Sequence, residues 1–194
     1  MEVLRDALRI TLFATMWAAL MVLLRRVPGL RGGDGNAKLY GDRHKAAGIA
    51  TSFIHSCAAL VWGVVLQQRG ELPPTRAWDA AMSEGEARCI AMLLGYLVVD
   101  LAMGWRGLSA LHRVHHVCGL YAWGLPLLTR SPCSIVVVAY FVAEAPNPLM
   151  HARWLLRHVA IPGSGHLVLA VEAGFIAAWF LGRQVPELYL CWNH

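Results

Sequence analysis

The sequence predicts an all-α, multi-pass transmembrane helical bundle of about six spans. Hydrophobic residues make up 57% of the chain and charged residues only 15%, whereas a soluble domain usually carries about 25% charged residues. The mean hydropathy is positive, at +0.49. The charged residues also gather beside long apolar segments, and a membrane-crossing helix needs about 20 mainly apolar residues. These observations together favour a membrane protein over a soluble domain.

The spans can be placed in chain order by their apolar runs. The expected spans cover residues 8–24, 46–66, 88–105, 111–128, 132–145 and 166–181. The first run is closed by Arg25 and Arg26 without a small-residue cleavage site, so we expect a retained span and not a removed signal peptide. Residues 149–158 carry Arg153 and Arg157 four positions apart, which indicates an amphipathic helix at the membrane interface.

The loops predict how the spans are oriented. Residues 25–45 hold six Lys and Arg residues, so the positive-inside rule places this loop in the cytosol and the N-terminus in the lumen. Alternation of the spans then brings Asp100, the histidines after residue 111 and Glu144 to the same cytosolic level. We therefore expect these polar side chains to line one cytosol-facing cavity. The endoplasmic reticulum or another endomembrane is the expected location, in preference to the plasma membrane.

Charge and cysteine usage exclude several classes of protein. The net charge of +5 could suggest nucleic acid, but basic residues beside apolar segments are typical of juxtamembrane loops. We therefore expect membrane lipids as partners and no nucleic acid, and a homo-oligomer is compatible with the chain. The five cysteines form no zinc spacing and are expected to pack as small apolar side chains.

The most informative motif is HRVHH, which begins at His112. Its three histidines, His112, His115 and His116, share one helix face at the start of the fourth expected span. Ionisable side chains at membrane depth are costly and therefore indicate a functional site by default. The motif leaves three interpretations open: a metal site, a proton-transferring site, or hydrogen bonding between helices. Glu172, in the last span, is by contrast expected to pair with another side chain of the bundle.

Metal binding is the weakest of the three interpretations. HxxHH resembles one histidine box of the membrane fatty-acid desaturases and hydroxylases, but the remaining histidines stand singly and cannot fill two iron coordination spheres. A mononuclear site with His115, His116 and a carboxylate is the alternative. Proton chemistry fits better, because Asp100 or Glu144 could orient a histidine that activates a hydroxyl or amine for acyl transfer from a thioester. Hydrogen bonding between helices remains the structural explanation.

Several segments together resemble the TLC-domain family. They are YLVVDLAMGW at 96–105, LHRVHHVCGL at 111–120, FVAEAPNPLMHARWLL at 141–156, DRHKAAGIATSFIHS at 42–56 and WFLGR at 179–183. The likeness covers about residues 42–186, and it resembles the small TLC-domain proteins more closely than the ceramide synthases. It implies a first span and basic loop at 1–41 and a TLC domain at 42–194. The run after Arg183 is too short to span, which leaves two alternatives: a domain shortened at the C-terminus or a natural six-span variant.

The resemblance also implies functional residues. In ceramide synthases, adjacent histidines mark the region that joins an acyl group to a sphingoid amine, and these correspond to His115 and His116. We therefore predict His115, His116, Asp100 and Glu144 as catalytic, and His55, His112 and His151 at a substrate cavity. No metal or cofactor is expected, with acyl-CoA as the candidate co-substrate.

The expected function is membrane lipid homeostasis through acyl-chain or sphingolipid handling. The alternatives are a non-catalytic lipid chaperone or translocon-type scaffold and, as a third, a metal-dependent lipid hydroxylase. Whether the chain is an enzyme stays open at this point.

Overall fold

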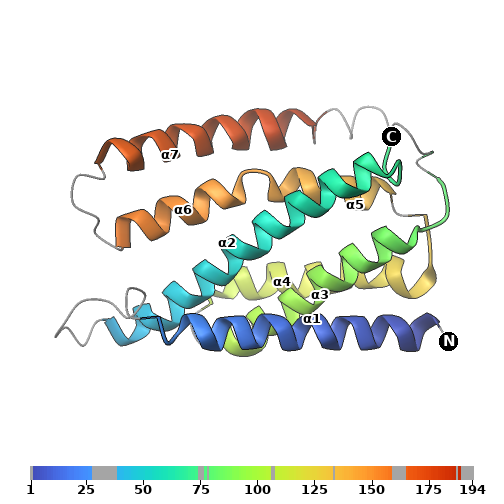
Figure 1. Ribbon diagram of the computed structural model, residues 1–194, viewed down its shortest axis with the longest axis horizontal. Helices are drawn as coiled ribbons and strands as arrows, with labels where there is room; N and C mark the ends of the chain where they lie inside the picture. The colour runs from blue at the N-terminus through green and yellow to red at the C-terminus, as the bar shows by residue number, and fades with distance from the viewer. Residues whose placement is uncertain are drawn as a thin grey trace. The chain divides into compact units, whose positions relative to one another are not determined.

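In the computed structural model most of the described residues are helical, and no strand is found among them (Figure 1). It describes residues 2–27, 39–73, 77, 79–105, 108–132, 134–158, 165–186 and 188, without the side chains of 39–45. The helices are α1 (Glu2–Leu24), α2 (Leu39–Gln68), α3 (Glu84–Gly104), α4 (Ala110–Thr129), α5 (Ser134–Glu144), α6 (Asn147–His158), α7 (Gly165–Trp179) and the π-helical turn η2 (Phe180–Gln184). The predicted all-α fold class is confirmed.

Five helical stretches of the described chain are long and apolar enough to cross a membrane. They are Glu2–Leu24, Ala46–Gln68, Glu84–Gly104, Ser134–Arg157 and Gly165–Gln184. The fourth expected span, residues 111–128, does form helix α4 but is not among these five. Three histidines and Arg113 lie in its first two turns and lower its hydropathy, so apolar length alone does not identify it as a span.

The segment after α5 differs in part from the expectation. A two-residue turn at Ala145 and Pro146 separates α5 from α6, and the apolar stretch Ser134–Arg157 runs through both helices. The expected helix at 149–158 does form, as α6, but it continues this stretch and does not stand apart from it. Its two arginines pair with a carboxylate of α7, and their side chains remain 40% and 51% exposed, which agrees with the predicted amphipathic character of this helix.

The chain divides into two compact units. The first consists of Met1–Leu23 and Trp62–Val138 and contains α1, α3 and α4. The second consists of Leu24–Val61 and Ala139–His194 and contains α6, α7 and most of α2 and α5.

Helix α3 is the core helix of the first unit. Its side chains are buried along most of its length, from Glu86 to Asp100. A glycine at position 95 allows α1 to approach closely, because a Cβ atom there would lie 2.8 Å from the backbone nitrogen of Ala14. One helical turn away from this approach, the rings of Trp17 and Tyr96 meet edge to face with centroids 6.1 Å apart.

In the second unit, ion pairs join α6 to α7. Arg153 Nε donates to Glu172 Oε1 at 2.8 Å, and Arg157 contacts the same oxygen. The two arginines are one helical turn apart on α6, so both reach one carboxylate of α7. The expectation that Glu172 pairs within the bundle is confirmed.

Candidate functional site

The start of α4 positions the histidine motif. Ser109 caps the helix, because its Oγ accepts a hydrogen bond from the backbone nitrogen of His112 at 3.3 Å. The same Oγ lies 2.7 Å from His112 Nδ1. Arg113 closes the preceding turn by donating to the carbonyl of Leu108 and by lying over the ring of Trp105, 4.9 Å from its centroid. His112 therefore contacts the residue that caps the helix, and its place at a substrate cavity stays a prediction.

His116 and Asp100 form the central contact of this site. Nε2 of His116 lies 2.7 Å from Oδ2 of Asp100, which joins α4 to α3 inside the first unit. Both residues are buried, each with 8% of its surface exposed. On the other side of the ring, Nδ1 of His116 lies 2.8 Å from the carbonyl oxygen of His112. Both ring nitrogens therefore face oxygen atoms.

These two contacts fix where the protons must be. A carbonyl oxygen cannot donate, so Nδ1 of His116 must carry a hydrogen. The contact between Nε2 and Oδ2 of Asp100 then needs a second hydrogen, bound to either atom. The pair is therefore either an imidazolium with a carboxylate or a neutral imidazole with a carboxylic acid, and it holds one exchangeable proton between the two helices.

His115 lies against this pair but on the surface of α4. Its side chain is exposed, whereas that of the adjacent His116 is buried. The two rings meet edge to face with centroids 5.6 Å apart. Of the two adjacent histidines, His115 is thus the one whose ring can meet a molecule at the helix surface.

A second polar group lies within the second unit. His55 of α2 is almost fully buried, and its Nε2 lies 3.2 Å from the hydroxyl of Tyr140 on α5. Its ring is also within electrostatic range of His151 on α6. The two predicted cavity histidines, His55 and His151, are therefore near each other, with Tyr140 as a further member.

Glu144 belongs to the same second unit. Asn147 Nδ2 donates to its Oε2 at 3.1 Å, and Ser56 of α2 forms a further hydrogen bond with its carboxylate. Arg183, in the π-helical turn η2, attracts the carboxylate electrostatically. Short π-helical turns inside helices are frequent at functional sites.

The predicted site residues thus fall into two sets. Asp100, His115 and His116 come together in the first unit, and Glu144, His55 and His151 lie in the second. A cavity shared by Glu144 and the Asp100–His116 pair stays a prediction, as do the catalytic roles. Sequence reasoning missed Tyr140, Ser56 and Asn147. Tyr140 is four residues before Glu144, a helical spacing that the sequence did contain. Asn147 contacts Glu144 across the turn between α5 and α6.

The side chains that could ligate a metal ion are spread out in the described part of the chain. Among these residues, no three His, Cys, Asp or Glu side chains are grouped so that they could hold a metal ion. Cys57, Cys89 and Cys118 are not joined in disulfides.

The helices and the buried pair define a class: a multi-pass helical membrane protein with a histidine–carboxylate contact between two of its helices. The family model described as the TLC domain matches residues 48–194. The chain therefore belongs to the TLC-domain family, an integral membrane family linked to lipid metabolism and homeostasis. Comparison with curated proteins and with solved structures gave no match.

Proposed function

We propose that this chain acts in membrane lipid homeostasis by handling acyl chains or sphingolipids at a cytosol-facing cavity. Its family supports the lipid role. The observation that carries the proposal is the buried contact of 2.7 Å between His116 and Asp100, with the exposed ring of His115 against it. A proton held between two helices beside an exposed histidine suits acid–base chemistry on a lipid.

The geometry divides the roles between the two histidines. Both nitrogens of His116 are engaged, so His116 and Asp100 act as positioning residues. His115 is the catalytic residue of the proposal. In acyl transfer from a thioester such as acyl-CoA, a substrate amine or hydroxyl attacks the carbonyl carbon and the carbon–sulfur bond breaks. His115 takes the proton of the attacking group and returns it to the thiolate.

The proposal includes a location and an orientation. We propose that the chain lies in the endoplasmic reticulum or another endomembrane, with residues 25–45 in the cytosol and the N-terminus in the lumen. Asp100 and the start of α4 then lie at the cytosolic side, where acyl-CoA is available. An N-terminal epitope tag should therefore be protected from protease in sealed microsomes and become accessible only after detergent is added.

Lipidomics of cells that express the chain tests the proposed reaction. The wild type should change the level of a specific acyl lipid, and His115→Ala should abolish this change at equal protein level. His166→Ala is the matched control, because His166 is also an exposed histidine but lies on α7 in the second unit and is not among the predicted site residues. An identical lipid profile for the wild type and His115→Ala would contradict the catalytic proposal.

One observation favours a second function, a non-catalytic lipid chaperone or translocon-type scaffold. Both nitrogens of His116 bond within the first unit, as they would in a contact that serves only to hold α3 and α4 together. Under this alternative, His115→Ala leaves the lipid profile unchanged. His116→Ala would then lower the amount of inserted protein or its binding to a partner protein.

A further inference from the structure

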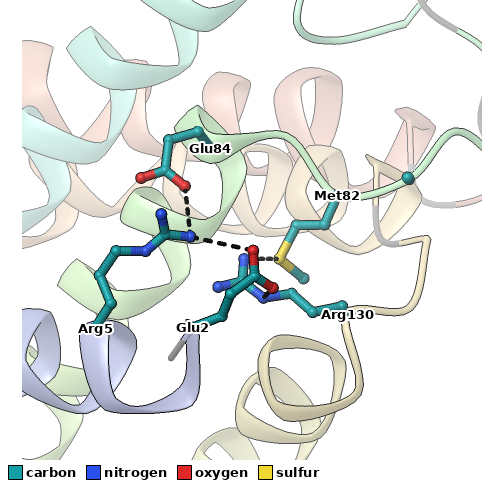
Figure 2. A pocket seen from close by; sticks show the side chains of 6 residues that line it. Glu2, Arg5, Met82, Glu84 and Arg130 are labelled. Atoms are coloured by element: carbon teal, nitrogen blue, oxygen red, sulfur yellow. Dashed lines mark hydrogen bonds and ion pairs between the residues drawn. The ribbon is translucent and has the colours of Figure 1, made fainter.

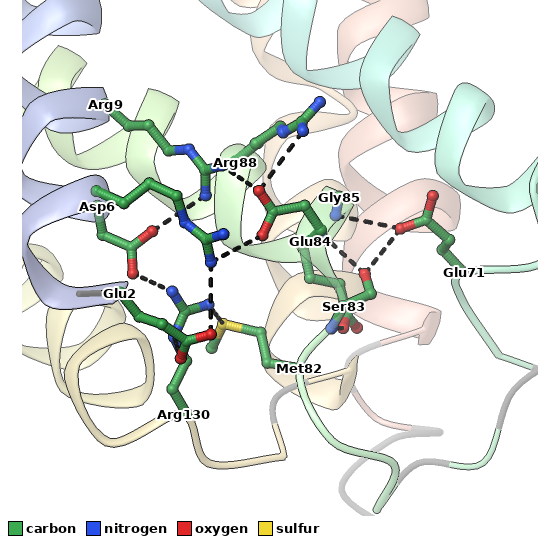
Figure 3. Close-up of polar contacts among 12 residues, drawn as sticks. Glu2, Asp6, Arg9, Glu71, Met82, Ser83, Glu84, Gly85, Arg88 and Arg130 are labelled. Carbon is green, nitrogen blue, oxygen red and sulfur yellow. Dashed lines mark hydrogen bonds and ion pairs between the residues drawn. The ribbon is translucent and has the colours of Figure 1, made fainter.

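A cluster of charged side chains lies at the other end of the first unit. Asp100 and Glu84 are 16 residues apart on α3, which corresponds to roughly 24 Å along the helix axis. We call this group the charge cluster; its members are Glu2, Arg5, Asp6, Arg9, Glu84, Arg88 and Arg130 (Figure 3). It joins the starts of α1 and α3 to the end of α4.

The inner part of the cluster holds the helices together. The side chain of Asp6 is only 6% exposed and contacts both Arg9, at 3.1 Å, and Arg130. Arg9 also contacts Glu84 of α3. These contacts around the buried Asp6 and the largely buried Arg9 tie α1 to α3 and to the residue that ends α4, so we assign them a structural role.

The outer part is exposed and borders a depression. The side chains of Glu2, Arg5 and Glu84 are 63%, 45% and 40% exposed. Together with Arg130, Ala81 and Met82 they line a depression of about 640 Å³ (Figure 2). Arg5 lies 3.2 Å from Glu84 and 3.6 Å from Glu2. Because exposed ion pairs contribute little stability, a charged ligand can replace these partners at low cost.

Arg130 has an unusual backbone for an arginine. Its φ of 53° places it in the left-handed region, and no other non-glycine residue of the described chain has a positive φ. Glycine or asparagine would end α4 with less strain. The arginine instead directs its guanidinium to the depression, where it lies 3.4 Å from Glu2 and 3.8 Å from the sulfur of Met82. Strain of this kind is often found at ligand sites.

The charges of the lining indicate the kind of ligand. Two guanidinium groups, of Arg5 and Arg130, and two carboxylates, of Glu2 and Glu84, face the same depression. Because their charges sum to zero, the lining matches a zwitterion better than a simple anion or cation. Arginine binds phosphate through paired hydrogen bonds, and a carboxylate accepts from a primary ammonium.

The position of the depression at the ends of membrane-crossing helices indicates the source of such a zwitterion. Both α1 and α3 are long and apolar enough to cross a membrane, and both begin beside it. The end of a membrane-crossing helix lies at the level of the lipid head groups. We propose that the depression binds the head group of a zwitterionic phospholipid with a primary ammonium, its phosphate on Arg5 and Arg130 and its ammonium on Glu2 and Glu84.

Native mass spectrometry of the full chain in detergent tests this proposal. The chain is titrated with short-chain phosphatidylethanolamine, phosphatidylcholine, phosphatidylglycerol and diacylglycerol. Phosphatidylethanolamine should bind most tightly, since it alone carries both a phosphate and a primary ammonium. Tighter binding of phosphatidylglycerol, equal binding of phosphatidylcholine, or equal binding of all four lipids would each overturn the proposal.

Two variants locate the binding. Arg5→Gln should weaken phosphatidylethanolamine binding about tenfold, as expected for the loss of one charge-assisted contact. Arg88→Gln is the matched control, because Arg88 contacts the same Glu84 at 3.5 Å and is 50% exposed but does not line the depression. Equal losses in the two variants would show a general effect of charge and overturn the assignment. Glu2→Gln, which alters the most exposed member, should weaken phosphatidylethanolamine without weakening phosphatidylglycerol.

Discussion

Nε2 of His116 lies 2.7 Å from Oδ2 of Asp100, and this contact connects α4 to α3. Since Nδ1 of the same ring faces the carbonyl oxygen of His112, the contact with Asp100 needs a proton of its own. A charge-assisted hydrogen bond between buried groups contributes more than a neutral one. The contact therefore has a consequence for stability that can be measured independently of any lipid reaction.

Removal of the Asp100 carboxylate should destabilise the first unit. Asp100→Leu leaves a buried imidazole nitrogen without its partner, and we expect the free energy of unfolding to fall by about 2–3 kcal/mol. Equilibrium unfolding in detergent micelles measures this change. Asp79→Asn is the control, because Asp79 is exposed and its variant should be within about 0.5 kcal/mol of the wild type. A loss for Asp100→Leu as small as that of the control would show that the pair contributes nothing to the fold.

Part of this site could be predicted from the sequence because some of its contacts lie within one helix. Histidines three and four residues apart share a helix face, so the contact from the His116 ring to the carbonyl of His112 follows from the helix itself. The Asp100 contact depends on how α3 packs against α4, which the expected topology anticipated by placing both groups at one level. The partners of Glu144 on α2 and in η2 are distant in sequence, and no periodic pattern relates Ser56 or Arg183 to it.

The helix starts and the contacts between helices likewise differ in how far the sequence predicts them. The third expected span began at Arg88, whereas α3 starts at Glu84. Ser83 and Glu86 form a capping box there, and this pattern can be recognised in a sequence. The pairing of Arg153 with Glu172 could not be recognised in this way, since it requires α6 and α7 to lie side by side. Without that information, the two arginines of residues 149–158 indicated only an amphipathic helix at the membrane interface.

The close approach of α1 to α3 predicts a size limit at position 95. In Gly95→Ala, the new methyl group would lie 2.8 Å from the backbone nitrogen of Ala14 and 3.0 Å from the carbonyl oxygen of Ile10. Backbone atoms cannot move aside without moving the helix, so we expect a loss of about 1–3 kcal/mol in the free energy of unfolding. Gly124→Ala is the matched control, because a Cβ atom at this position of α4 would meet no neighbouring side chain or segment within 4 Å. That control should be neutral or more stable, since alanine favours helix; equal losses would argue against close packing of α1.

The pairing of both α6 arginines with one carboxylate predicts that their effects are not additive. Arg153→Gln and Arg157→Gln should each lower the thermal unfolding midpoint slightly, because the other arginine still contacts Glu172. Once Glu172→Gln is present, either arginine substitution should have almost no further effect. A thermal-shift series over the single and double variants measures the coupling. Additive shifts would show that the arginines do not act through Glu172.

The contact between Tyr140 and His55 predicts a specific role for one hydroxyl group in the second unit. Tyr140→Phe keeps the ring but removes the atom that lies 3.2 Å from His55 Nε2, and His55 is only 1% exposed. A buried imidazole nitrogen that loses its partner costs about 1–3 kcal/mol, so the free energy of unfolding should fall by that amount. Tyr121→Phe removes the same atom from a side chain that is 72% exposed and should change stability by less than about 0.5 kcal/mol.

His55→Phe in the Tyr140→Phe background would then restore part of the loss, because both partners of the hydrogen bond are absent. If Tyr140→Phe and Tyr121→Phe are equally stable, the hydroxyl does not support the buried histidine, and a role for Tyr140 in the second polar group would have to be abandoned.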